Sequence, residues 1–483
     1  MASRRAVRGP TEPTRLALRG LSRSPRAAYD SGVNRTPIRP GATLDLVAGP
    51  WDPQGACRTD VGGIELRVPG LIPGEEARVL VTGRSRGGPV AWGVVEQVER
   101  PHPARREPPC PTHGPCGACP LMHADEDASL RLRVESALPL LPPALRAVLM
   151  PEEQWVRSAP WGWRHKAVLV PSEMGDRLGL GGFARGTHDV VDLPSCGVLA
   201  PALQTARDAL VEALSPLLNR GLHPAPPGRE GRGLRALVLR GSRRGGVLAT
   251  AVVRDEETGR SLAPALEELV ERGVLTGGFL QVFDAPGDAV HGRDTPRHLA
   301  GAASLDESVG GAVLPVLPLG FFQVNPGVLE GIVRSLASSV GAPRSVLDAY
   351  SGAGALGIGL ASALPTAPGL VGCDVVPASV EAANATAARA GLDARYLVGT
   401  PVDCATEPDL ALLDPPRRGC RPKELDAVLA TEPAEIAYVS CSPAALGRDA
   451  ERILAAGYEA LSLLPADMLP QTPHLELVAR FRR

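Results

Sequence analysis

The sequence predicts a multidomain protein in which a small β-barrel and an α+β domain precede a doubly wound α/β domain. The chain has 483 residues, more than a single hydrophobic core ordinarily organises. Residues 41–100 alternate short β-forming runs with glycine and proline turns, which is the spacing of a small barrel. From Val346 onward, apolar strands alternate with helical segments, as in a sheet covered by helices.

The first 40 residues differ from the rest of the chain in composition. Residues 1–40 carry nine arginines against Glu12 and Asp30, without a sustained apolar period. This composition predicts a disordered basic arm, although a transit peptide or a misassigned start codon would produce the same pattern. The net charge of the whole chain is −2, so a nucleic-acid partner must bind a local basic patch. No apolar run reaches transmembrane length, and we expect a soluble, cytoplasmic monomer without membrane contact.

The predicted barrel covers residues 41–101, and its strands read ATLDLVAG, GGIELRVPG, EEARVLVTG and VAWGVVEQV. Small barrels of this kind often bind RNA on one face, but the fold alone assigns no activity. The arginines in and after these strands form either a local RNA-binding patch or a solvated rim. They are Arg84, Arg86, Arg100, Arg105 and Arg106.

A cysteine array follows the barrel, in CPTHGPCGACPLMH. Cys110, Cys116 and Cys119 are spaced as C-x5-C-x2-C, which is typical of ligands for an iron–sulfur cluster or for zinc. A fourth ligand is needed, and Cys196 in DLPSCGVL is the candidate. Two histidines within the array keep zinc open as the alternative metal. The cysteines outside the array and the catalytic region are interpreted as small buried hydrophobes or incidental thiols: Cys57, Cys373, Cys404 and Cys420.

The predicted α+β domain covers residues 102–320. We expect a helix over 128–148, β segments in RHKAVLV, HDVVDL, LRALVLRG and GVLATAVVR, and a helix near 262–272. Just beyond it, FFQVNP places Gln323 and Asn325 before a helix, where their amides can cap that helix or reach a cofactor. This region joins the cysteine array to the C-terminal domain.

The segment from Val346 to Asp374 is predicted to be one βαβ unit. Asp348 ends its first strand, and Gly352 and Gly354 form the turn in which backbone can approach a ligand closely. The glycine spacing also fits NAD, but a carboxylate just before the glycines would repel a pyrophosphate. S-adenosylmethionine carries a sulfonium and an ammonium, so the acid favours it as the cofactor. A purely structural turn remains the alternative.

Two more strands are predicted to end in reactive side chains. A helix at 377–390 precedes the strand ARYLVG, DLALLDPPRRG then ends a strand at Asp414, and EIAYVSCSP ends another at Cys441. Ligands of doubly wound sheets bind outside the carboxyl ends of the strands, so Asp348, Asp374, Asp414 and Cys441 should share one crevice. At such a rim Cys441 is a candidate nucleophile, with an inert core thiol as the alternative.

Four motifs occur together: GAGAL after Asp348, LLDPPRRG, YVSCSP and DMLPQTPHLE. In this order they resemble the RNA uracil-C5 methyltransferases, and FFQVNP and the cysteine array agree. The resemblance covers residues 41–483. It implies an OB-like TRAM barrel over 41–101, a central domain with a [4Fe–4S] cluster over 102–320, and a Rossmann-like class I methyltransferase domain over 321–483.

The resemblance also implies residue roles. Cys441 would be the nucleophile that bonds to C6 of the uracil and Glu476 the general base. The cluster ligands would be Cys110, Cys116, Cys119 and Cys196; the cofactor or the uracil would be lined by Gln323, Asp374 and Asp414. The implied partner is RNA, with ribosomal RNA favoured over transfer RNA. The chain departs from the usual family pattern at Met122, Ser351 and Thr400, which leaves the cofactor affinity and the subfamily open.

Two other functions remain open at this point. Amino-methyltransferases grip a target nitrogen with an Asp/Asn-Pro-Pro-aromatic loop and need no cysteine. Arg417 follows the two prolines where that class has an aromatic residue, and Cys441 has no role there. An RNA-binding iron–sulfur protein without activity is the non-enzymatic alternative. It is disfavoured because nucleophile, base and cofactor acid are all present.

Overall fold

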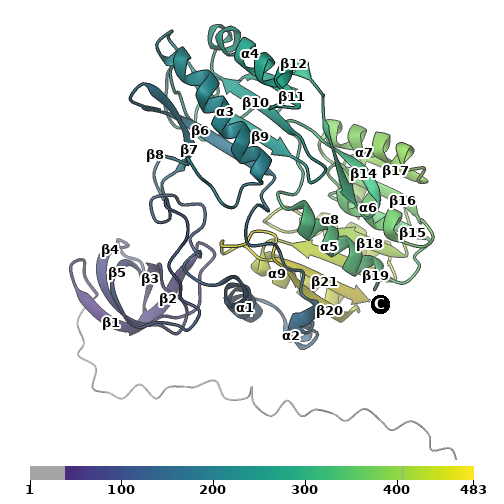
Figure 1. Ribbon diagram of the computed structural model, residues 1–483. Coiled ribbons are helices and arrows are strands. Elements are labelled where there is room, and N and C mark those ends of the chain that lie inside the picture. Colours follow the sequence, from purple (N-terminus) through teal and green to yellow (C-terminus); the bar gives the residue numbers. More distant parts are fainter. Residues whose placement is uncertain (1–37, 405) are drawn as a thin grey trace, which may run out of the picture.

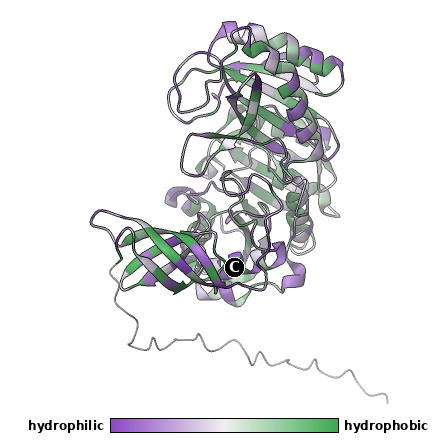
Figure 2. Cartoon of the chain, turned by 60° about the vertical axis from the view of Figure 1, so that its left-hand side comes forward, coloured by the Kyte–Doolittle hydropathy of each residue, from purple (hydrophilic) through white to green (hydrophobic). Residues whose placement is uncertain are grey.

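The computed structural model describes residues 38–404 and 406–483, which form four β-sheets with helices packed around them (Figure 1). The predicted disordered arm, residues 1–40, lies almost wholly outside the described part. Hydrophobic residues concentrate in the strands of the sheets, and hydrophilic residues gather on the outer faces of helices and on loops (Figure 2). Within the described ranges, no helix is both long and apolar enough to cross a membrane.

The N-terminal sheet has five strands in the order β1-β4-β5-β3-β2. Side chains alternate along β4, where Ala77, Val79 and Val81 are buried in the sheet's core. An antiparallel bridge between Trp51 and Cys57 joins the chain after β1 to β2, so the two edges of the sheet approach each other. The strands are β1 Thr43–Val47, β2 Ala56–Val61, β3 Ile64–Pro69, β4 Glu76–Arg84 and β5 Val90–Arg100.

The helix expected over 128–148 is broken into shorter pieces, so that prediction was wrong in its extent. Prolines 139, 142 and 143 cannot donate a backbone N–H, which ends the first helix and starts a new one. Leu130 and Leu145 pack in one core with Tyr438 and Phe481 of the C-terminal sheet. The pieces are α1 Glu126–Ala137, η1 Leu138–Leu140 and α2 Pro143–Ala147, followed by η2 Glu152–Gln154.

The central sheet has seven strands in the order β12-β11-β10-β9-β6-β7-β8, and α3 and α4 pack on one of its faces (Figure 1). Helix α4 starts earlier than expected because Asp255 caps it, accepting a hydrogen bond from Thr258 N at 3.0 Å. The elements are β6 Lys166–Met174, β7 Arg177–Phe183, β8 Val190–Asp192, α3 Pro201–Leu218, β9 Leu234–Gly241, β10 Val247–Val253, α4 Glu256–Glu271, β11 Gly277–Val282 and β12 Arg297–Gly301. A hairpin follows, β13 Leu305–Val309 and β14 Ala312–Val316.

The C-terminal sheet is the predicted doubly wound sheet, with strand order β17-β16-β15-β18-β19-β21-β20. The first five strands in this order are parallel, and β21 is antiparallel to both neighbours. Helices α5, α6 and α7 share a core with one face, and α8, α9 and α1 share a core with the other.

The strands of this domain are β15 Ser345–Ala349, β16 Gly369–Asp374, β17 Ala394–Val398, β18 Leu410–Leu413, β19 Glu435–Ser440, β20 Glu459–Ala466 and β21 Glu476–Arg482. Its helices are α5 Pro326–Ala337, α6 Ala355–Ala363, α7 Pro377–Arg389, η3 Pro401–Asp403, α8 Pro422–Ala430 and α9 Pro443–Ala455. The helix expected at 377–390 and the strand expected in ARYLVG are both present.

Candidate active site

The strand register brings the predicted reactive residues to one edge of the C-terminal sheet. Ala349 of β15 pairs with Cys373 of β16 and with Leu413 of β18, so these three parallel strands end side by side. Ser440 of β19 pairs with Leu477 of the antiparallel β21. The next position on each strand therefore sets Cys441 beside Glu476. Asp348, Asp374 and Asp414 lie at the ends of β15, β16 and β18 along the same edge.

The glycine turn after β15 is tied to the end of β16 by Asp374. Its carboxylate accepts a hydrogen bond from Gly352 N at 2.9 Å and one from Val376 N at 2.9 Å. Gly354 has a φ of 79° and starts α6, a conformation that favours glycine. Tyr350 enters the turn with a φ of 60°, and its hydroxyl donates to Glu424 at 2.8 Å. The half-buried Asp374 thus holds the turn and faces the strand-end edge.

Asp348 lies beneath this turn rather than on its surface. Its side chain is buried, and Tyr396 donates a hydroxyl hydrogen bond to Oδ2 at 3.2 Å. A Cβ placed on Gly357 would lie 2.3 Å from the same oxygen, so α6 packs directly against the carboxylate. Burial raises the pKa of Asp348 to about 7, with smaller contributions in the same direction from Asp414 and Asp374. A cation bound above the turn would stabilise the ionised carboxylate.

Exposed valines surround the ends of β16 and β17, a feature that the sequence analysis did not single out. Large apolar side chains gathered in one place mark a binding surface more strongly than scattered ones do. In the sequence, three of them directly follow GCD or RYL at the strand ends, and the fourth lies in the short helix η3 after β17. They are Val375, Val376, Val398 and Val402, which are 66, 49, 56 and 58% exposed.

The nucleophile side of the edge holds three acids and one cation. Burial, together with Glu476 and Asp414, raises the pKa of the Cys441 thiol to about 11, and Arg417 opposes this shift. Burial also raises the pKa of Asp414 to about 7. The pKa of Glu476 lies well above its usual range because the carboxyl is buried and faces Asp414. These acids cannot all be ionised at neutral pH, so they share protons.

The backbone around Cys441 presents the thiol at the start of a helix. Ser442 caps α9 by accepting a hydrogen bond from Ala445 N at 3.4 Å, and Pro443 takes the first helical position. Ser440 Oγ accepts from Ser442 N at 3.1 Å and fixes the turn between strand and helix. The positive end of the helix dipole favours a thiolate at this position.

The two amides of FFQVNP have different positions. Asn325 caps α5, accepting from Val328 N at 3.3 Å, and its Nδ2 donates to Ser158 Oγ at 2.8 Å. The amide of Gln323 has no hydrogen-bond partner among residues 38–404 and 406–483. Phe321 is 66% exposed and lies near the Cα of Gly352, since a Cβ built there would be 3.9 Å from its ring. Gln323 is therefore the amide free to contact a ligand at the turn.

Gln471 connects the loop before Glu476 to the cysteine region, and the sequence analysis missed it. Its backbone has a φ of 59°, and its carbonyl accepts from Leu121 N at 3.0 Å. Its buried side-chain amide donates to Pro160 O at 2.7 Å and accepts from Trp163 Nε1 at 3.4 Å. In the sequence, only the position of Gln471 inside the motif DMLPQTPHLE could have indicated its role. Gln471 joins three separate segments at the approach to β21.

Three of the four predicted cluster cysteines pack on one apolar cluster, and the fourth, Cys116, is near enough to Cys119 to affect the pKa of its thiol. Cys110, Cys119 and Cys196 pack against Met122, Trp163 and Val198, and against Leu469 of the loop that carries Gln471. Burial, together with the neighbouring thiols of Cys196, Cys116 and Cys110, raises the pKa of the Cys119 thiol to about 12. All four of these cysteines are half-buried. In the part of the chain that the structure describes, no group of three or more His, Cys, Asp or Glu side chains is close enough to hold a single metal ion.

The four cysteines can be compared with the needs of the two groups considered above, a zinc ion and an iron–sulfur cluster. A single zinc ion needs four donors within about 2.3 Å of one point, whereas each cysteine of a cubane cluster binds a different iron. The remaining predicted hydrophobes, Cys57, Cys373, Cys404 and Cys420, are buried, as expected.

Comparison with known proteins gives close relatives over nearly the whole chain. The chain is 31% identical over 473 residues to an uncharacterized RNA methyltransferase of Gloeobacter violaceus, covering 92% of this chain and 99% of the relative. It is 32% identical over 468 residues to an uncharacterized RNA methyltransferase of Parasynechococcus marenigrum, covering 92% and 96%. No protein-family model matches the chain.

The solved structure of a tRNA (uracil-54, C5)-methyltransferase from Pyrococcus abyssi, in complex with S-adenosyl-L-homocysteine, is similar in fold. Its TM-score is 0.71 at 23% identity, and the match covers 90% of this chain and 99% of that one. The C-terminal domain accordingly has the class I methyltransferase fold that the sequence resemblance implied.

Proposed function

The chain belongs to the RNA methyltransferase family of these relatives, and we propose that it transfers a methyl group from S-adenosylmethionine to C5 of a uridine in RNA. The observation that carries this proposal is the register that sets Cys441 beside Glu476 at the ligand-binding edge of the sheet. Methylation of a nitrogen needs neither residue, whereas methylation at C5 of uracil needs a nucleophile and a base together.

The chemistry explains why a thiol is required. Uracil C5 is too weak a nucleophile to take a methyl group unaided. Cys441, as a thiolate, bonds to C6, and the electron pair of the C5–C6 double bond moves to C5 as an enolate. C5 then forms a bond to the methyl carbon as the carbon–sulfur bond of the donor breaks. Glu476 removes the C5 proton, and the electrons released expel the Cys441 thiolate and restore the double bond.

The protons that the acidic groups of the site share take part in the steps of methyl transfer. Burial raises the pKa of both Asp414 and Glu476, and Asp414 raises that of Glu476 further, so that one of the two can accept a proton while the other holds one. Arg417 lowers the pKa of the Cys441 thiol and so favours the attacking thiolate. A protonated Asp414 can donate a hydrogen bond to a uracil carbonyl. The target base must first be unstacked from the RNA to enter this edge.

On the cofactor side, Asp374 would bind the ribose hydroxyls of S-adenosylmethionine, and the exposed valines would cover its adenine. Gln323 and the backbone at Gly352 and Gly354 would contact the amino-acid end. The buried Asp348 would face the positive charge of that ligand from beneath the turn. Bound in this way, S-adenosylmethionine supplies the methyl group.

Replacing Asp374 by alanine should weaken S-adenosylmethionine binding by about 1.5–3 kcal/mol, the range for hydrogen bonds to a charged group. Asp374→Asn is the matched variant, because its amide oxygen can still accept from Gly352 N. It should lose less affinity than the alanine variant. Isothermal calorimetry on the full chain measures both. Equal affinity of wild type and Asp374→Ala would reject this assignment.

We further propose that Cys110, Cys116, Cys119 and Cys196 hold a [4Fe–4S] cluster. The support is that three of them pack on one apolar cluster and that the other three thiols raise the pKa of Cys119. Protein purified without oxygen should be brown and contain about four iron and four sulfide per chain. Iron and sulfide assays, with zinc measured in parallel, test this. Stoichiometric zinc without iron would contradict it.

The proposal treats the N-terminal sheet as a TRAM barrel and RNA as the substrate, with ribosomal RNA favoured over transfer RNA. We place the protein in the cytoplasm, as a monomer. The test is mass mapping of modified nucleosides in RNA from a deletion strain. One 5-methyluridine should disappear and return with the wild-type gene. An intact set of 5-methyluridines would refute the proposal.

A further inference from the structure

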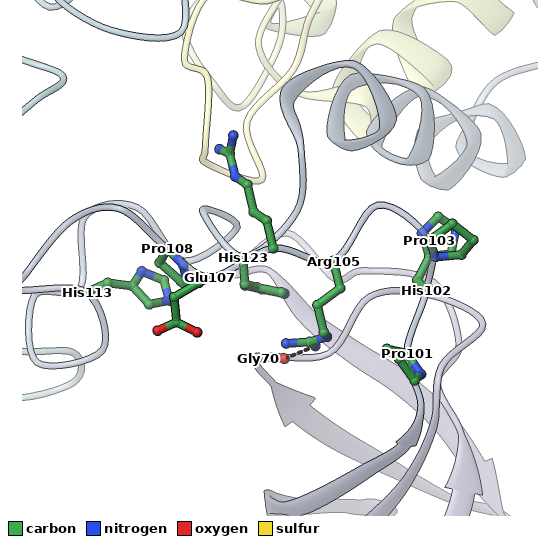
Figure 3. Close-up of a pocket in the computed structure, with 10 residues that line it drawn as sticks. Gly70, Pro101, His102, Pro103, Arg105, Glu107, Pro108, His113 and His123 are labelled. Atoms are coloured by element: carbon green, nitrogen blue, oxygen red, sulfur yellow. Dashed lines mark hydrogen bonds between the residues drawn. The ribbon is translucent and has the colours of Figure 1, made fainter.

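A cavity of about 710 Å³ opens where the N-terminal sheet, the linker after β5 and the cysteine loop meet (Figure 3). It is separate from the strand-end site, because none of its lining residues belongs to the C-terminal sheet. Its walls include Gly70, His102, Arg105, Glu107, His113 and His123. We refer to this space as the junction cavity.

Arg105 forms one side of the junction cavity, and hydrogen bonds hold its guanidinium in place. Arg105 donates to the fully buried carboxylate of Glu75 from Nε at 2.5 Å and from one terminal nitrogen at 2.6 Å, and that nitrogen also donates to Gly70 O at 2.8 Å. Backbone amides of Ile72 and His102 donate to the same carboxylate at 2.8 and 3.0 Å. The second terminal nitrogen of Arg105 has no partner in the described ranges. It is a preorganised donor.

The other side of the junction cavity offers acceptors. His123 is 3% exposed, and its Nε2 lies 3.3 Å from Leu71 O, so Nε2 carries the proton and Nδ1 is an acceptor. Nδ1 is buried without a hydrogen-bond partner among the described residues. Figure 3 shows the carboxylate of Glu107 beside the ring of His113, with His123 next to them. The two imidazole rings are 6.3 Å apart, tilted by 51°.

This combination selects against several ligand classes. The free terminal nitrogen of Arg105 could donate a hydrogen bond to an inorganic anion, but the carboxylate of Glu107 in the same lining would repel it. No three side chains here are close enough to hold a metal ion within the described ranges. A nucleobase fits better, because its edge carries donors and acceptors together and its faces pack on imidazole and proline rings. The volume lies within the usual range for small-molecule sites, about 300–1,000 Å³.

We propose that the junction cavity is a second nucleotide site, which binds an unstacked, amino-bearing base of the RNA substrate away from the target uridine. Guanine matches the side chains best. Its N1–H and N2–H donate to the carboxylate of Glu107, and its O6 accepts from the free terminal nitrogen of Arg105. This inference rests on the proposed RNA substrate and adds to it a base preference outside the catalytic edge.

The test uses full-length, anaerobically purified protein and oligouridylates of about twelve nucleotides, a typical single-strand site size. One probe carries a central guanosine, a second carries inosine, which lacks the N2 amine, and a third is uridine throughout. We expect wild-type protein to bind the guanosine probe about tenfold more tightly than the other two. Glu107→Ala should remove this preference. Glu96→Ala, the same change on an exposed glutamate of β5, should keep it.

Each outcome decides a separate question. A guanosine preference that survives Glu107→Ala, or no preference in the wild type, would overturn the junction-cavity inference. Formation of 5-methyluridine is measured in parallel on RNA from the deletion strain. If methylation occurs but Glu107 has no effect, the proposed function stands and the inference fails. If Glu107 determines the preference but no methyl group is transferred, the inference stands and the proposed function fails.

Discussion

Cys441→Ala should abolish methyl transfer to RNA and leave no covalent protein–RNA species. Without the thiolate, C5 of the uracil never gains the electron density that attacks the methyl group, so the loss should be on the order of 10⁴-fold or more. The side chain is half-buried and makes no hydrogen bond or ion pair within the described ranges, so the fold should be unaffected. Single-turnover transfer of labelled methyl at saturating RNA measures the effect.

Two further variants make this result specific. Cys441→Ser keeps the shape of the side chain but offers a far weaker nucleophile, and should be as inactive as the alanine variant. Cys57→Ala removes a buried thiol from the N-terminal sheet and should retain the rate of the chemical step. Methylation by Cys441→Ala within tenfold of wild type would show that the reaction needs no nucleophile. The amino-methyltransferase alternative would then return.

Glu476→Gln should stop the reaction one step later and accumulate an adduct. The amide has nearly the volume of the carboxyl, so attack at C6 and methyl transfer proceed, while removal of the C5 proton fails. Turnover should fall by about 10²–10⁴-fold, the range for a general base. The trapped species should appear as a retarded, methyl-labelled band on a denaturing gel.

A simpler explanation is that Glu476 only forms an ion pair with a nearby arginine. The structure supplies the control for this explanation. Arg480 pairs with Glu435 instead, at 2.7 Å, and the Glu476 carboxyl is buried without an ion-pair partner in the described part of the chain. Replacing it by an amide should not destabilise the fold, because an unpaired buried acid is itself costly. Glu435→Gln should turn over normally. A Glu476→Gln enzyme that also turns over without an adduct would leave the base unassigned.

The C-terminal sheet was predictable because its strands are continuous apolar runs that end in polar residues. Such runs are buried on both faces, and the alternation with helices fixes their order and the edge where ligands bind. The local sequence pattern alone therefore predicted that Asp348, Asp374, Asp414 and Cys441 lie at this edge of the sheet. Glu476 was different, because only the family motif marked it. Its position beside Cys441 depends on the antiparallel insertion of β21, which no local signal specifies.

Other features depend on contacts between distant segments, and for that reason the sequence did not predict them. The helix over 128–148 was overextended because its apolar spacing outweighed three prolines in the prediction. Periodicity shows that α1 has a buried face, but not that this face packs on the C-terminal sheet. The contacts of Gln471 join residues that are more than 300 positions apart, as in its bond to Trp163. A left-handed glutamine gives no sequence signal comparable to a glycine.

The most direct test of C5 methylation through Cys441 is mass spectrometry of the digested Glu476→Gln adduct. The account predicts a peptide containing Cys441, joined through sulfur to C6 of a uridine that already carries the new methyl group on C5. A methyl group on a base nitrogen with no peptide attached, or a bond from any residue other than Cys441, would contradict it.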